Sequence, residues 1–135
     1  MALIVGIVLP FVIGGFATIT GLDRDRAFYP VVMIVIALLY VLFAAIGGSG
    51  EALLVDGAIA VAFIAAAVIG FKRSLWIVAA ALLAHGGMDL FHGSLVDNPG
   101  VPAWWPAFCG PYDAGAAGYL GWLLKSGRPE DAGAV

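Results

Sequence analysis

The strongest constraint on this chain is a series of five apolar stretches, each long enough, or nearly so, to cross a bilayer as a helix. Crossing the hydrocarbon core takes about 20 mostly apolar residues in helical form. Glycine, proline and charged residues separate the stretches, as is typical of turns. The sequence therefore predicts an all-α, polytopic membrane helical bundle with about five transmembrane helices, at 2–20, 27–46, 53–71, 74–92 and 107–124.

The composition supports a membrane location and limits the partners. Of the 135 residues, 63% are hydrophobic and only 11% are charged, whereas a soluble domain carries about 25% charged residues. A soluble chain of this length could not bury so much apolar surface in one core. The net charge of −3 and the lack of basic patches argue against nucleic acid. Membrane lipid is the expected partner, and no nucleic acid is expected.

The chain is expected to form one transmembrane domain, residues 1–126, with a short cytoplasmic tail at 127–135. Its first stretch has no Lys or Arg before the apolar run and no clear cleavage site, which favours a retained helix over a signal peptide. The last stretch is the weakest, because its apolar core is short and Pro111 lies near its start. A four-helix bundle with a re-entrant last segment is the alternative.

The six basic residues set the orientation. With five spans, all of them fall in connections on one side, which should be the cytoplasm because Lys and Arg favour that side. This places the amino terminus outside and the carboxyl terminus in the cytoplasm. The basic residues are Arg24, Arg26, Lys72, Arg73, Lys125 and Arg128.

The same topology divides the acidic residues into two groups. Four of them lie on the cytoplasmic side with the bases: Asp23, Asp25, Glu130 and Asp131. The outer half holds two histidines and five acids but no Lys or Arg, namely His85, His92, Glu51, Asp56, Asp89, Asp97 and Asp113. A carboxylate in a membrane is costly unless a cation, a proton, a metal ion or water compensates it. The outer half is therefore the candidate functional site.

The centre of that site is the segment His85-Gly-Gly-Met-Asp89-Leu-Phe-His92. On a helix, its three polar residues project within an arc of about 60° and share one face. The i,i+4 spacing of His85 and Asp89 resembles that of helical metal-chelating pairs. Because His85 and His92 are separated by about 10 Å of rise, two of the three could bind one ion with the third in support, unless the helix ends before His92.

A divalent transition metal such as zinc needs more ligands than this segment offers. Asp113 completes the predicted metal set of His85, Asp89 and His92. Further side chains are candidates for ligands or hydrogen-bonding support: Glu51, Asp56, Cys109 and Tyr112. No catalytic residue is assigned, and the single cysteine excludes a disulfide within the chain.

Each of these residues also has a structural interpretation. His85 and Asp89 could form a buried hydrogen-bonded pair that fixes helix packing. Cys109 could be a small buried hydrophobe, and Asp56 could cap the helix at 53–71. Tyr40 faces either the core or the lipid headgroups, and no catalytic role is expected for it.

Small residues recur every four positions in the third and fifth stretches, and such faces let helices approach closely. They are Ala62, Ala66 and Gly70, followed by Ala114, Ala117, Gly118 and Gly121. Packing within one chain explains them. A subunit interface, in a homo-oligomer or with a larger membrane-protein partner, is the alternative.

Three segments carry a resemblance: DRDRAFYP at 23–30, HGGMDLFH at 85–92 and NPGVPAWWPAFC at 98–109. Over nearly its whole length the chain resembles an uncharacterised family of small bacterial multi-pass membrane proteins with an HGxxDxxH segment, classified as a domain of unknown function. The resemblance implies a single domain in the bacterial plasma (inner) membrane and no particular activity. The His-Asp-His pattern is also similar to that of intramembrane metal-dependent lipid hydrolases, which have more helices and further histidines that this sequence lacks.

Three functions fit the sequence. The first is metal binding in an outer-face His/Asp pocket; an enzyme of this kind would be a metal-dependent membrane hydrolase with a free carboxylate as general base on a metal-bound water. The second is a proton-coupled transporter or carrier, in which carboxylates and histidines relay protons. The third is a structural or accessory membrane subunit whose polar cluster only fixes the fold.

Overall fold

A computed structural model of the chain, which describes residues 1–129, consists of five long helices and one short 3-10 turn, with no strand among those residues. The helices are α1 (Ala2–Thr20), α2 (Phe28–Gly47), α3 (Gly50–Lys72), α4 (Leu75–Leu95) and α5 (Trp105–Lys125), and the turn is η1 (Leu22–Arg24). The predicted all-α bundle is therefore confirmed. Part of the predicted tail, with Glu130 and Asp131, lies outside the described residues.

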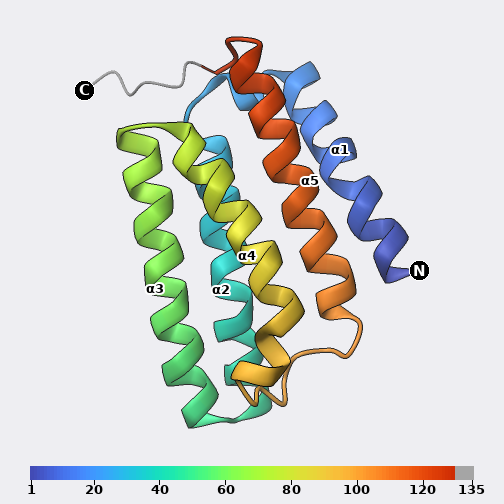
Figure 1. The fold of residues 1–135 in the computed structure, drawn as a ribbon, viewed down its shortest axis with the longest axis vertical. Helices are drawn as coiled ribbons and strands as arrows, with labels where there is room; N and C mark the ends of the chain where they lie inside the picture. Colours follow the sequence, from blue (N-terminus) through green and yellow to red (C-terminus); the bar gives the residue numbers. More distant parts are fainter. Residues whose placement is uncertain (130–135) are drawn as a thin grey trace.

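Each helix runs antiparallel to the one before it (Figure 1). α2, α3 and α4 pack together, α5 packs on α4, and α1 lies at the edge of the bundle against α5. Helices α1 to α4 are long and apolar enough to span a membrane. α5 is less apolar, but its 21 residues form one continuous helix beside α1. From the sequence alone, a re-entrant segment is the alternative for this part of the chain.

The helix boundaries differ from the predicted ones where polar residues continue a helix beyond its apolar stretch. α3 begins at Gly50, because the Ser49 side chain accepts a hydrogen bond from the Ala52 N–H at 3.1 Å and caps the helix. Asp56 therefore lies inside α3, and its interpretation as a cap is wrong. α4 runs through His92 to Leu95, so the alternative in which it ends before His92 is also wrong.

The two ends of the bundle have different chemistry. The α1–α2 and α3–α4 connections and the end of α5 lie together at the upper end in Figure 1, and the six basic residues all belong to these segments. The Arg26 guanidinium donates a hydrogen bond to the Phe71 carbonyl at 2.8 Å and ties the first connection to the end of α3. The opposite end, called here the outer end, holds the amino terminus and the connections that follow α2 and α4.

A glycine, Gly86, lets α4 and α5 approach closely in the middle of the bundle. A Cβ atom at Gly86 would lie 2.8 Å from the Gly110 carbonyl oxygen and 3.0 Å from the Asp113 Cβ, which is closer than ordinary contact. The helices can therefore cross here only because Gly86 has no side chain. This crossing brings the polar face of α4 against α5.

The small-residue faces serve packing within the chain at some positions and not at others. Gly70 is buried against Val78 of α4, where a Cβ would come within 3.1 Å of the Val78 nitrogen. Ala114 and Gly118 on α5 are exposed instead. A subunit interface at the exposed positions stays a prediction.

Candidate metal centre

Four potential metal ligands converge between α4 and α5. His85 and Asp89 lie one turn apart on α4, and Cys109 and Asp113 lie one turn apart on α5. One ligand atom from each residue lies within 4.8 Å of all the others. The four residues are buried, with relative exposures of 1%, 1%, 2% and 0%. Two i,i+4 pairs on facing helices thus form one compact group of imidazole, thiol and carboxylate donors, called here the metal group.

The contacts within the metal group centre on the imidazole. His85 Nδ1 lies 2.7 Å from Asp113 Oδ2, which is a hydrogen bond, and 3.8 Å from Asp89 Oδ2, which is an ion-pair distance only. The Cys109 Sγ lies 3.8 Å and 3.9 Å from the two carboxylate oxygens of Asp113. The predicted structural pair of His85 and Asp89 is therefore not hydrogen-bonded, and the imidazole bonds to α5 instead.

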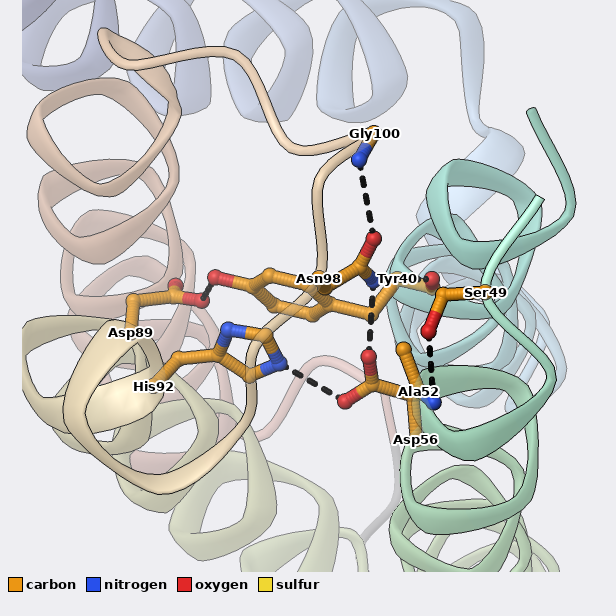
Figure 2. Close-up of polar contacts among 8 residues, drawn as sticks. All are labelled: Tyr40, Ser49, Ala52, Asp56, Asp89, His92, Asn98 and Gly100. Carbon is orange, nitrogen blue, oxygen red and sulfur yellow. Dashed lines mark hydrogen bonds and ion pairs between the residues drawn. The ribbon is translucent and has the colours of Figure 1, made fainter. Parts of the chain in front are cut away.

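Asp89 also forms a hydrogen bond with a residue of α2 that is not part of the metal group. The Tyr40 hydroxyl on α2 donates a hydrogen bond to Asp89 Oδ1 at 2.5 Å (Figure 2). Asp89 Oδ2 is buried and makes no hydrogen bond among the described residues. A buried carboxylate oxygen without a donor is costly, so this atom is available for a ligand. Sequence reasoning missed Tyr40, although a buried tyrosine usually needs a partner for its hydroxyl.

His92 belongs to a second polar group, nearer the outer end. Its Nε2 lies 2.7 Å from Asp56 Oδ1 on α3, and the Asn98 side-chain amide donates to Asp56 Oδ2 at 2.8 Å. The same amide donates to the Tyr40 carbonyl at 3.0 Å, while Asn98 Oδ1 accepts from the Gly100 N–H (Figure 2). Sequence reasoning missed Asn98 too, because a loop asparagine ordinarily needs no buried partner.

The Tyr40 side chain lies between the two groups. Its ring stacks on the His92 ring with centroids 3.8 Å apart, and its hydroxyl reaches Asp89. Figure 2 shows the ring lying between the Asp89 and Asp56 carboxylates. Buried polar residues therefore extend from the α4–α5 connection to the middle of α4, with ring stacking in place of a hydrogen bond at the step from His92 to Tyr40.

The structure thus brings together three of the four predicted ligands, His85, Asp89 and Asp113, and adds Cys109 from the supporting set. His92 and Asp56 form their own pair. The remaining candidates lie away from both groups. Glu51 is exposed in the first turn of α3, and Asp97 is exposed in the connection after α4. Tyr112 is half-buried and stacks on Phe108.

The buried network carries too little positive charge. Asp56, Asp89 and Asp113 supply three carboxylates, while His85 and His92 supply at most two positive charges. All six Lys and Arg residues belong to segments at the opposite end. Even with both imidazoles protonated, the formal charge would be −1, and an uncompensated charge in a membrane interior is strongly unfavourable. At least one further cation or proton is therefore required.

Comparison of the chain with protein-family models, with curated proteins and with solved structures finds no match. The function of the metal group therefore has to be argued from its own geometry and charge.

Proposed function

We propose that this multi-pass membrane protein binds one divalent transition-metal ion, with zinc the first candidate, through His85, Asp89, Asp113 and Cys109. The observation that carries the proposal is the convergence of four buried donor atoms within 4.8 Å. Imidazole nitrogen, carboxylate oxygen and thiolate sulfur are the ligands of protein zinc sites. The unpartnered Asp89 Oδ2 supplies a further argument, since an ion would satisfy it.

The donor atoms lie within 4.8 Å of one another, so a tetrahedral ion would have to draw the widest pairs together by up to about 1.2 Å. Ligand bonds of about 2.0–2.3 Å in a tetrahedron place the donor atoms roughly 3.4–3.6 Å from one another. The contacts of Asp89 Oδ2 with His85 and of Cys109 with Asp113 are 3.8 Å or slightly longer, which is within a few tenths of an ångström of that value. The 2.7 Å hydrogen bond from His85 to Asp113 would open by about 0.7 Å. An ion would then replace the proton that the two side chains share.

Charge balance supports a divalent ion in particular. With a neutral His85 and a neutral thiol, the carboxylates of Asp89 and Asp113 balance two positive charges. Beside it, a protonated His92 balances Asp56 at 2.7 Å. The whole buried network is then formally neutral, which is what the membrane interior favours. A Cys109 thiolate bound to the ion would leave the network at −1, so charge balance favours the form of the site in which Cys109 stays a thiol.

The role of Cys109 decides what kind of site this is. Four protein donors make a closed, structural zinc site, whereas three donors leave a position for water and are typical of catalysis. If Cys109 stays a thiol, a nitrogen and two oxygens hold the ion and hydrolytic chemistry becomes accessible. X-ray absorption at the zinc edge separates the two, because only the closed site has a zinc–sulfur bond near 2.3 Å.

The membrane and the orientation are part of the proposal. The resemblance to small bacterial membrane proteins supports a location in the bacterial plasma membrane. The six basic residues at one end support an amino terminus outside. The metal group then lies in the outer half of the bilayer, reached from outside the cytoplasm or from the lipid.

Metal analysis of the detergent-purified protein tests the proposal. The expected result is about one ion per wild-type chain, and at least about tenfold less in His85→Ala and Asp89→Asn, as loss of a ligand requires. Asp97→Asn is the matched control, because Asp97 is exposed and should leave the metal content unchanged. A folded wild-type protein that takes up no zinc, cobalt, iron or manganese would overturn it.

One observation favours a second candidate, a proton-coupled carrier. Buried titratable side chains follow one another from Asp56 and His92 to Asp89 in the middle of the bundle, and the Tyr40 ring is stacked on the His92 ring between them. Such a series can relay protons. Proton flux into liposomes that Asp89→Asn abolishes, by a wild-type protein free of metal, would favour this candidate over metal binding.

A further inference from the structure

An elongated apolar groove lies along the bundle between α1 and α2, with α5 as its floor. Its volume is about 650 Å³, within the range of about 300–1,000 Å³ typical of small-molecule pockets. It exists because α1 packs mainly on α5 and leaves one face of α2 uncovered. Its lining includes Leu9, Ile13, Val31, Val35, Phe108 and Tyr112.

The groove has the length and the open shape that suit a hydrocarbon chain. Its lining residues on α2 run from Phe28 to Leu39, which corresponds to about 16 Å of helical rise. A flexible acyl chain can follow an apolar groove of this length and volume.

The lining has the polarity of an acyl-chain site. The side chains contributed by α1 and α2 are all apolar. Asp25 is the one charged residue in the lining, and it lies at the basic end of the groove. Val31 and Val35 are 53% and 54% exposed, so the groove is open toward the lipid. Because it lies within the membrane, the molecule at hand to fill it is a lipid chain.

The outer end of the groove adjoins the metal group. Cys109 lines the groove and also belongs to the metal group. Trp105, one turn nearer the outer end, lines the groove as well; it is 8% exposed, and its Nε1–H is buried without a hydrogen-bond partner among the described residues. Tryptophan is typical of the interfacial region of a membrane, where the ester groups of lipids lie.

We infer that the groove holds one acyl chain of an outer-leaflet glycerolipid, with its ester end at Trp105 and Cys109, so that a membrane lipid is the substrate class of the metal site. The part that concerns the substrate rests on the proposed metal function. The part that concerns lipid binding rests on the groove alone.

Photo-crosslinking in nanodiscs tests the inference. The probe is a phosphatidylglycerol with a diazirine midway along one acyl chain, and crosslinked residues are mapped by mass spectrometry. Crosslinks should concentrate on Ile13, Val31 and Val35. Val35→Trp should fill the groove and lower them about tenfold, the effect of roughly 1.4 kcal/mol. Val61→Trp is the matched control, since Val61 is 67% exposed on α3 and does not line the groove.

The outcomes separate the groove from the metal site. Crosslinks spread evenly over the lipid-facing residues, or unchanged in Val35→Trp, overturn the inference, and so do crosslinks between two copies of the chain at the groove. Zinc is measured in the same samples. Concentrated crosslinks on a protein without zinc leave the lipid groove standing and overturn its role as a substrate site. If zinc is present at one ion per chain but the crosslinks are evenly spread, lipid binding in the groove is refuted and metal binding is not.

Discussion

The close crossing of α4 and α5 offers a sharp test of the metal group's geometry. Gly86 has no room for a side chain, because a Cβ there would lie 2.8 Å from the Gly110 carbonyl oxygen. Gly87, the next residue on α4, has no heavy atom within 4 Å of its Cβ position. The change Gly86→Ala and its control Gly87→Ala therefore add the same methyl group to the same helix, one against α5 and one into open space.

The size of the effect follows from the overlap. Ordinary contact begins at 3.4 Å, so Gly86→Ala must push the helices apart by about 0.6 Å. Overpacking of this kind costs about 1–3 kcal/mol, while alanine in place of glycine in a helix gains up to about 1 kcal/mol. Gly87→Ala shows only the gain. Gly86→Ala should therefore be about 1–3 kcal/mol less stable than Gly87→Ala.

Metal binding should change this difference. In the metal-free protein the separation stretches the hydrogen bond from His85 to Asp113 from 2.7 Å to about 3.3 Å, beyond the usual range of about 2.7–3.2 Å. Around an ion the same donors lie about 3.4 Å apart in any case. The metal-bound protein should therefore tolerate the added methyl group better than the metal-free protein.

Thermal unfolding in detergent measures both effects. With a chelator present, Gly86→Ala should unfold about 4–12 °C below Gly87→Ala, at roughly 4 °C per kcal/mol. With saturating zinc the gap should shrink. Equal midpoints for the two variants in chelator would show that the helices do not cross at Gly86. A gap that zinc leaves unchanged would show that no ion spreads these donors.

Three further predictions test the surrounding network and the topology. Tyr40→Phe should lower the free energy of unfolding by about 1–3 kcal/mol, because it leaves Asp89 Oδ1 without its donor. Tyr29→Phe should be nearly neutral, since the buried Tyr29 hydroxyl has no partner among the described residues. Asn98→Asp should lower the free energy of unfolding by about 3 kcal/mol, because it places a second carboxylate against that of Asp56. Asp97→Asn, at an exposed position, should change the free energy of unfolding by no more than about 0.5 kcal/mol. In intact bacterial spheroplasts, a membrane-impermeant maleimide should label Asp97→Cys but label Ser126→Cys only after permeabilisation; the reverse pattern would invert the orientation.

The fold was largely predictable because hydropathy and turn chemistry act locally. The first stretch matches α1 residue by residue, and Ser74 caps α4 by accepting the Trp76 N–H, as its position after Lys72 and Arg73 suggests. The predicted helix ends were wrong where polar residues extend a helix, as at the start of α3 and the end of α4. Glu51 belongs to α3 although it is charged, because the first turn of a helix favours an acid.

The site was predictable only as far as one helix determines it. The spacing of His85, Asp89 and His92 correctly placed all three on one buried face of α4. Which helix each residue meets depends on how α4 crosses its neighbours, and a single sequence does not contain that register. At the level of His85 the face meets α5 and its Asp113. Two turns further on it meets α3 and Asp56.

The division between the two polar groups comes from Tyr40, whose role has a physical reason that the sequence alone could not show. Its ring covers His92 and its hydroxyl satisfies one oxygen of Asp89, so the other oxygen stays free toward the metal group. A phenylalanine would keep the separation of the groups but would leave Asp89 without this orientation. Asp89 and Asp113 are therefore the carboxylates whose charge the proposed divalent ion would compensate, while Asp56 pairs with His92.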